Sequence, residues 1–233
     1  MDSNINYEIL DGNNLSKTVD GKLVLLKEDG FSDETNTNLK TALADLEAKE
    51  TAQNTAAKKA QNKTAEQDKI ITGVYSLVKR TRNSVRSAYE DDQAMLSQFR
   101  VNEPIPNSVK NLRSLCEYLN PLVIKESAVL LKNGLMQNDI DELGTASSRI
   151  LAVDSEQEQA KKLQQSATIL RNNAAKELTK QIKKVRTFVK ARFEKRPEIS
   201  VLFDPIPKGR GGSGSGDEPT PPDNTTPPTT PAQ

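Results

Sequence analysis

The chain contains a long stretch in which apolar residues recur at alternating steps of four and three positions. Residues 33–100 contain no proline and a single glycine, Gly73, so little in that stretch interrupts a helix. Apolar residues spaced in this way line the face of a helix that packs against another helix. We therefore predict a long helix over residues 33–100, and the same pattern predicts a second over residues 138–196.

The seam between the two helices is expected to contain their large apolar residues. These are Leu39, Leu43, Leu46, Val74, Val78 and Val85 in the first helix, and Leu143, Ile150, Leu178, Ile182, Val185, Val189 and Phe193 in the second. The middle of the seam holds smaller or polar residues instead, such as Ala57, Ala60, Gln164 and Ala167. Because alanine buries little apolar area, a lone pair of helices is expected to be marginally stable there, which favours a homo-oligomer.

A comparison of the chain with itself indicates an internal repeat. A shift of 104 positions brings like residues together without a gap, including Leu26 with Leu130, Gly30 with Gly134, Arg82 with Arg186 and Val85 with Val189. Two helices rich in Ala, Lys, Glu and Gln can also resemble each other through composition alone. The matching glycines and basic blocks favour a tandem duplication, in which each unit has a short helix, a glycine that ends it, and a long helix.

The connector between the long helices, residues 101–137, sets their relative direction. It contains Pro104, Pro106 and Pro121, and its pattern predicts two short helices, over about 108–119 and 122–133. Two short helices cannot return along a helix of about 100 Å, so the two long helices must be antiparallel. This direction also places the acidic start of each long helix beside the basic end of the other.

The remaining segments lie outside the long helices. Residues 1–32 are expected to hold a short helix near 22–27, and residues 197–208 a proline-containing cap. Residues 209–233 are rich in Gly, Ser, Pro and Thr and lack the apolar residues of a core, so disorder is expected. The predicted fold is therefore all-α: tandem-duplicated units of a short and a long helix form an elongated, antiparallel, coiled-coil-like rod, with short helices packed at its ends and a disordered tail.

Composition narrows the functions that such a rod can carry. The chain has no histidine and one cysteine, Cys116, which excludes imidazole bases, zinc sites built on those ligands and internal disulfides. Cys116 lies among leucines spaced for one buried helix face, so we expect a buried thiol. We therefore predict that the protein is not an enzyme and uses no catalytic residues, cofactor, metal ion or small-molecule substrate.

The N-terminal residues and the hydropathy of the chain bear on its location. No basic start is followed by an apolar run, and no segment has the roughly 20 apolar residues of a membrane span. A cytoplasmic protein without a membrane span is the expectation. The formal net charge of +1 argues against binding to polyanions over the whole surface.

The basic end of the second long helix is the one candidate for contact with a polyanion. Its residues Lys183, Lys184, Arg186 and Lys190 could neutralise phosphates, with Phe188 and Phe193 nearby. The simpler interpretation is a solvated helix face that pairs with the acidic start of the neighbouring helix. We favour that interpretation and keep the polyanion contact as the alternative.

Three stretches of the chain resemble a family of uncharacterised bacterial proteins with two similar long helices. They are LEAKETAQNTAAKKAQNKTAEQDK, SEQEQAKKLQQSATILRNNAAKELTKQIKKVR and the closing RFEKRPEISVLF. The resemblance covers about residues 39–203 and rests on motifs of low complexity. It implies a bacterial origin, and it implies no activity, cofactor or functional residue.

These observations favour a structural or scaffolding protein that acts through contacts between proteins, chiefly with its own copies. A helical protein that associates with nucleic acid through the basic ends of the long helices is the alternative. An enzyme ranks a distant third.

Overall fold

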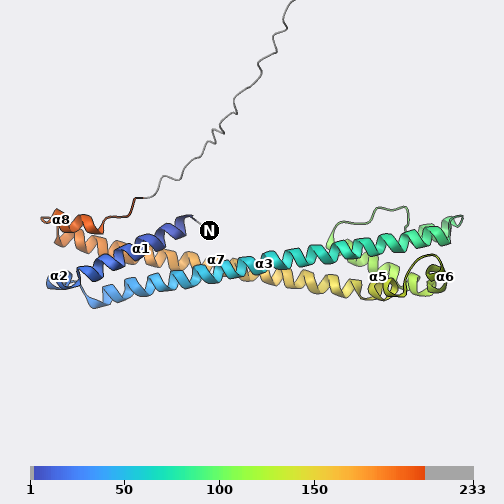
Figure 1. Cartoon of the computed structure of the whole chain (residues 1–233), viewed down its shortest axis with the longest axis horizontal. Helices are drawn as coiled ribbons and strands as arrows, with labels where there is room; N and C mark the ends of the chain where they lie inside the picture. The colour runs from blue at the N-terminus through green and yellow to red at the C-terminus, as the bar shows by residue number, and fades with distance from the viewer. Residues whose placement is uncertain (1–2, 208–233) are drawn as a thin grey trace, which may run out of the picture.

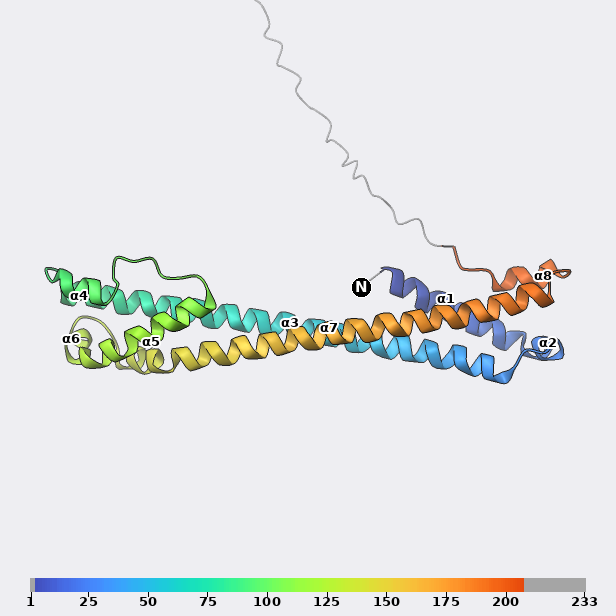
Figure 2. The same cartoon turned by 180° about the vertical axis from the view of Figure 1, so that it is seen from behind.

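The fold is known from a computed structural model that describes residues 3–207. Two helices of 56 residues dominate it, α3 (Asp33–Ala88) and α7 (Gln137–Arg192). They run antiparallel and side by side along a rod (Figures 1 and 2). At 1.5 Å per residue each long helix extends over about 84 Å. The expected disordered tail, 209–233, lies outside the described residues.

Short helices lie at both ends of this pair (Figure 1). At one end are α1 (Ser3–Gly21), α2 (Leu23–Glu28), α8 (Pro197–Ser200) and the 3-10 helix η1 (Val201–Phe203). At the other end are α4 (Gln93–Gln98), α5 (Val109–Lys125) and α6 (Ser127–Lys132). Every regular element within residues 3–207 is helical, as the sequence predicted, and no helix there is long and apolar enough to cross a membrane.

The core is divided between the two ends of the rod. One cluster joins α1, α2 and α8 to the start of α3 and the end of α7. The other joins α4, α5 and α6 to the end of α3 and the start of α7. The large apolar residues predicted for the seam are all buried in these two clusters, and the first leucines of α3 share a cluster with the last apolar residues of α7.

The two halves of the rod have matching elements. Helices α2 and α6 begin at residues 23 and 127, and α3 and α7 at residues 33 and 137, so each second helix follows the first by 104 residues. Gly30 and Gly134 precede the long helices, and both have φ of +91°. The backbone N–H groups of Phe31 and Leu135 then bond to the carbonyls of Leu26 and Leu130, which ends the short helix in each half.

The first long helix is shorter than the sequence predicted. It ends at Ala88 rather than near residue 100, because Asp92 accepts hydrogen bonds from the N–H groups of Ala94 and Met95 and so begins α4. The apolar spacing continues through Met95 and Phe99, which pack on the same cluster from this separate helix. The second long helix ends at Arg192, four residues before the expected end at 196.

The connector and the N-terminal segment also differ from expectation. Helix α5 continues through Pro121 to Lys125, so the predicted break near residue 120 is wrong. Its buried residues Leu112, Leu119 and Val123 keep one face on the core across the proline. In the N-terminal segment, α1 precedes the expected short helix and packs on α3 and α7. Gly12 permits this packing, because a Cβ there would lie 3.1 Å from Leu43 and 3.2 Å from Leu178.

Candidate functional site

The four basic residues predicted to contact a polyanion lie in the last third of α7, but they do not form one surface. Lys183, Lys184 and Lys190 are exposed. The Arg186 side chain, in contrast, turns inward and is only 16% exposed. The prediction that Arg186 contacts a polyanion is therefore wrong, because its charge is already paired inside the protein.

Arg186 forms a two-pronged ion pair with Asp11 of α1. Its Nη1 and Nη2 donate to the two carboxylate oxygens at 2.9 and 2.8 Å, and Nε donates to the carbonyl of Phe203 at 2.8 Å. Asp11 also accepts the N–H of Ile206, whose carbonyl accepts the Tyr7 hydroxyl at 2.9 Å. These hydrogen bonds link α1 and the segment after η1 to α7, so Arg186 contributes to the packing of the three segments.

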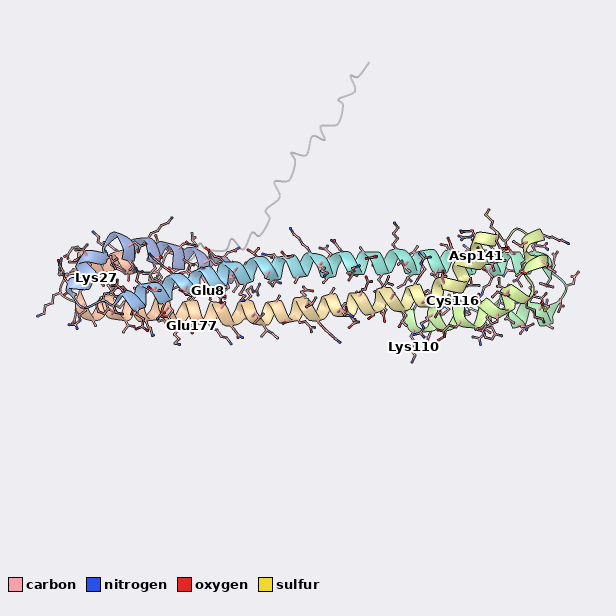
Figure 3. The ribbon with its side chains drawn as sticks, turned by 90° about the horizontal axis from the view of Figure 1, so that it is seen from below. Glu8, Lys27, Lys110, Cys116, Asp141 and Glu177 are labelled. Carbon is pink, nitrogen blue, oxygen red and sulfur yellow. The ribbon has the colours of Figure 1, made fainter. Side chains whose placement is uncertain are left out.

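The lysines of the same stretch line a groove between α1 and α7. Its volume is about 890 Å³, and its lining includes Lys176, Lys180, Lys183 and Lys184 together with Ile5 and Glu8. Figure 3 marks this stretch of the rod by Glu8 and Glu177. The pKa of Glu177 is lowered, first by a hydrogen bond from Gln181 and then by one from Lys180, so this carboxylate offsets part of the lysine charge. Lys190 lines a different hollow, beside Phe193 and Pro197.

Along its middle the rod consists of α3 and α7 alone, as Figures 1 and 3 show. The contacts between the two helices there are mainly polar. Gln67 donates to Asp154 at 2.8 Å and Gln157 to Thr64 at 3.2 Å. Further toward the α1 end, Arg171 and Glu50 form a buried ion pair at 3.5 Å. Few large apolar side chains lie in this seam, so it contributes little hydrophobic stabilisation.

Large apolar side chains in the same part of α7 point outward instead. Leu163, Ile169 and Leu170 are 56%, 61% and 49% exposed, and we call them the central apolar patch. The patch lies close to the midpoint of α7 (Gln137–Arg192), in the part that no short helix covers. The four-three spacing of the seam does not include these residues, so the sequence prediction missed them. The seven-residue step from Leu163 to Leu170, off the seam, is a signal that could have revealed the patch.

The thiol of Cys116 and the acidic side chains are the remaining candidate groups. Cys116 is buried in α5, at the end of the rod opposite Glu8 (Figure 3). Burial, with a smaller effect of Glu117, raises the pKa of this thiol to about 11, so the thiolate is disfavoured. Within residues 3–207, no group of three or more acidic or cysteine side chains is arranged to hold a metal ion.

Comparisons of the chain with models of protein families, with curated proteins and with solved structures find no match. The resemblance to a bacterial long-helix family therefore gains no support from them. Roles for this rod follow from its own geometry.

Proposed function

We propose that the protein is a non-enzymatic scaffold that associates with its own copies through the central apolar patch. The observation that carries the proposal is the exposure of Leu163, Ile169 and Leu170 over the thinnest part of the rod. Full burial of an exposed side chain of this kind contributes about 1.5–3 kcal/mol, and roughly half of that is still to be gained here, because each side chain is about half exposed in a single copy. A second copy that covers the patch would thicken the rod where the α3–α7 seam is weakest.

The position of the patch suits a symmetric pair. A twofold axis near residue 166 would bring each patch onto the same patch of the other copy, as a self-complementary interface requires. Interfaces of this kind close after two copies, so the expected product is a dimer and not an open filament. The ends of both rods would remain free for other partners.

Light scattering coupled to size exclusion tests this proposal over a range of protein concentrations. We expect the intact chain to exceed its 25.6 kDa monomer mass as the concentration rises. The double variant Leu163→Lys, Leu170→Lys should remain monomeric, because charges would have to be buried in the interface. The control is Leu10→Lys, Leu202→Lys, which changes two exposed leucines at the end of the rod and should associate like the intact chain. Equal association of both variants would contradict the proposal.

We also propose that the rod arose by tandem duplication of a unit made of a short helix, a glycine and a long helix. The support is the spacing of 104 residues between α2 and α6 and between α3 and α7, together with the equal φ of Gly30 and Gly134. Duplication accounts for an antiparallel pair in which each end is built in the same way from different parts of the chain.

A second candidate function is binding of a nucleic acid or another polyanion along the lysine-lined groove. What favours it is the gathering of Lys176, Lys180, Lys183 and Lys184 at one groove. Fluorescence anisotropy with labelled DNA and RNA at several salt concentrations tests it, because phosphate contacts weaken as salt rises. Neutralising Lys180, Lys183 and Lys184 of the groove to Gln should weaken binding, whereas neutralising the exposed Lys58, Lys59 and Lys69 of α3 should not. If the intact chain shows no salt-sensitive binding, this candidate is removed.

A further inference from the structure

Two arginines at corresponding positions, one at each end of the rod, have different surroundings. Arg82 of α3 and Arg186 of α7 occupy the same place in their halves, 104 residues apart. Arg186 faces Asp11, and the position that corresponds to Asp11 in the other half is Leu115 of α5. Arg82 therefore lacks the carboxylate that its counterpart has.

The surroundings of Arg82 compensate its charge only in part. The residue is 5% exposed, and within the described chain its guanidinium makes one hydrogen bond, from Nη1 to the carbonyl of Glu103 at 2.7 Å. Its Nε is buried and has no hydrogen-bond partner. Burial and the nearby Arg100 lower the pKa of Arg82, although Glu103 opposes them. A buried guanidinium in this condition is costly unless an anion is supplied.

A pocket adjoins Arg82 on the side of α5. Its volume is about 490 Å³, and its lining includes Arg82, Arg100, Glu103, Asn111, Ser114 and Tyr118. The Arg100 guanidinium lies 4.4 Å from the centre of the Tyr118 ring, and Arg100 has φ of +53°, a conformation that a non-glycine residue adopts at a cost. Asn111 and Ser114 add side-chain donors to the two arginines.

We propose that this pocket binds a carboxylate, which takes the place that Asp11 fills at the other end of the rod. The two arginines supply positive charge, and Glu103 offsets only part of it, since its exposed carboxylate lies 4.0 Å from the Arg100 Nε. A carboxylate matches the geometry of a guanidinium and pairs with it by charge-assisted hydrogen bonds. The site lies at the α5 end of the rod, away from the central apolar patch, so it does not depend on self-association.

The side chain Nε–H signal of Arg82 in nitrogen-15 NMR spectra reports directly on this pocket. The signal is assigned by its loss in Arg82→Lys. Acetate, succinate and a short peptide of aspartate and glutamate are titrated at constant ionic strength, with chloride and sulfate as comparison anions. We expect a saturable shift with a carboxylate and none with chloride. A response to acetate or succinate identifies a small carboxylate as sufficient, and a response to the peptide alone identifies an acidic side chain of a protein.

Three variants make the test specific. Leu115→Asp places a carboxylate where Asp11 would be and should weaken the binding of added carboxylate by at least about tenfold. Ser114→Asp, at an exposed position of α5 that lines the pocket, should do the same if Leu115→Asp fails to fold. Glu103→Gln removes the competing internal charge and should strengthen binding severalfold.

Two results would overturn the proposal. One is an Arg82 signal that does not respond to any carboxylate in a folded protein. The other is an equal response to sulfate, which would mean a nonspecific anion effect. A shift that depends on protein concentration alone would support the site and identify the carboxylate as one from a second copy. The Leu163→Lys, Leu170→Lys variant should keep its response to added carboxylate, so failure of the scaffold proposal can be told apart from failure of this one.

Discussion

Buried charged residues distinguish one end of the rod from the other. Asp11 is 4% exposed, and its two carboxylate oxygens accept hydrogen bonds from the two Nη groups of Arg186. Such a pair adds little compared with well-packed apolar residues, but removal of one partner leaves an uncompensated charge. The pair therefore fixes where α1 lies on α7. Its loss should lower the free energy of unfolding far more than the loss of a surface ion pair.

Asp11→Asn should lower the free energy of unfolding by about 3–5 kcal/mol, because Arg186 would remain buried without a counter-charge. Urea unfolding followed by circular dichroism measures the change. The matched control is Asp20→Asn on the same helix, where Asp20 pairs with Lys40 at 2.7 Å but both side chains are nearly half exposed. That control should cost no more than about 1 kcal/mol. Equal costs for the two variants would mean that Asp11 is not buried as described.

Cys116 gives a second prediction for a single residue. Its pKa of about 11, against an ordinary value of 9.0, follows mainly from burial. At pH 8 the folded protein should react with a thiol reagent about 100-fold more slowly than a free thiol, because two pKa units reduce the thiolate by that factor. Deprotonation is also easier in the unfolded chain, so the thiol's contribution to stability should fall as pH rises from about 9 toward 11. Full reactivity should return in urea, and a fast reaction without urea would contradict the burial of Cys116.

At the scale of elements, the glycines that precede the long helices should be intolerant of substitution. Gly134 has φ of +91°, which an L-residue adopts only with strain. Gly134→Ala should lower the free energy of unfolding by about 1–2 kcal/mol. Gly73 lies inside α3, and a Cβ added there would meet no other atom within 4 Å, so Gly73→Ala should instead raise it by about 0.5–1 kcal/mol. Thermal unfolding of both variants checks the opposite signs, and a destabilising Gly73→Ala would argue against a continuous α3.

The polar layers of the middle should set the register between α3 and α7 without adding much stability. Glu50→Leu alone should lower the free energy of unfolding by about 1.5–3 kcal/mol, since Arg171 loses the buried carboxylate that lies 3.5 Å from it. Adding Arg171→Leu should recover most of that loss, because two leucines can pack where the ion pair stood. A double-mutant cycle of unfolding free energies measures the coupling, and strictly additive costs would contradict the contact.

The elements with regular apolar spacing could be predicted from the sequence. Helix ends and helices that depend on other contacts could not. The long helices follow from the four-three spacing, which leaves few alternatives once Leu39, Val78, Leu143 and Val189 are aligned. The end of α3 at Ala88 was missed because the spacing continues into α4, whose start depends on the Asp92 side chain. Helix α1 was missed because its asparagines and glycines are poor helix formers, and packing on α3 and α7 outweighs that preference.

The candidate sites were harder to predict than the fold. Lys183, Lys184 and Lys190 are exposed as their positions on the helix suggested. The inward turn of Arg186 depends on Asp11, which lies 175 residues earlier in the chain. No local pattern contains such a contact. Arg82 stands out only once its surroundings are compared with those of Arg186, which requires both halves of the structure.

For the molecule as a whole, the arrangement implies an uneven distribution of stability. The two apolar clusters hold the ends, and the polar and alanine-rich middle joins them with little buried apolar area. Such a middle is expected to open more readily than the ends unless a second copy covers it. Association through the central apolar patch would therefore both protect the middle and space the two ends, which is what a scaffold needs.

The central claim is that α3 and α7 remain extended through this middle. Pulsed electron paramagnetic resonance between nitroxide labels at Ala44→Cys and Lys79→Cys, in a Cys116→Ala background, tests it most directly. Both positions are exposed on α3, on either side of the middle, and an unbroken helix separates their backbones by about 52 Å. We predict a single narrow distribution near that distance, given the reach of the labels. A main population much shorter than this would mean that the long helix folds back on itself, and it would contradict both the rod and the scaffold built on it.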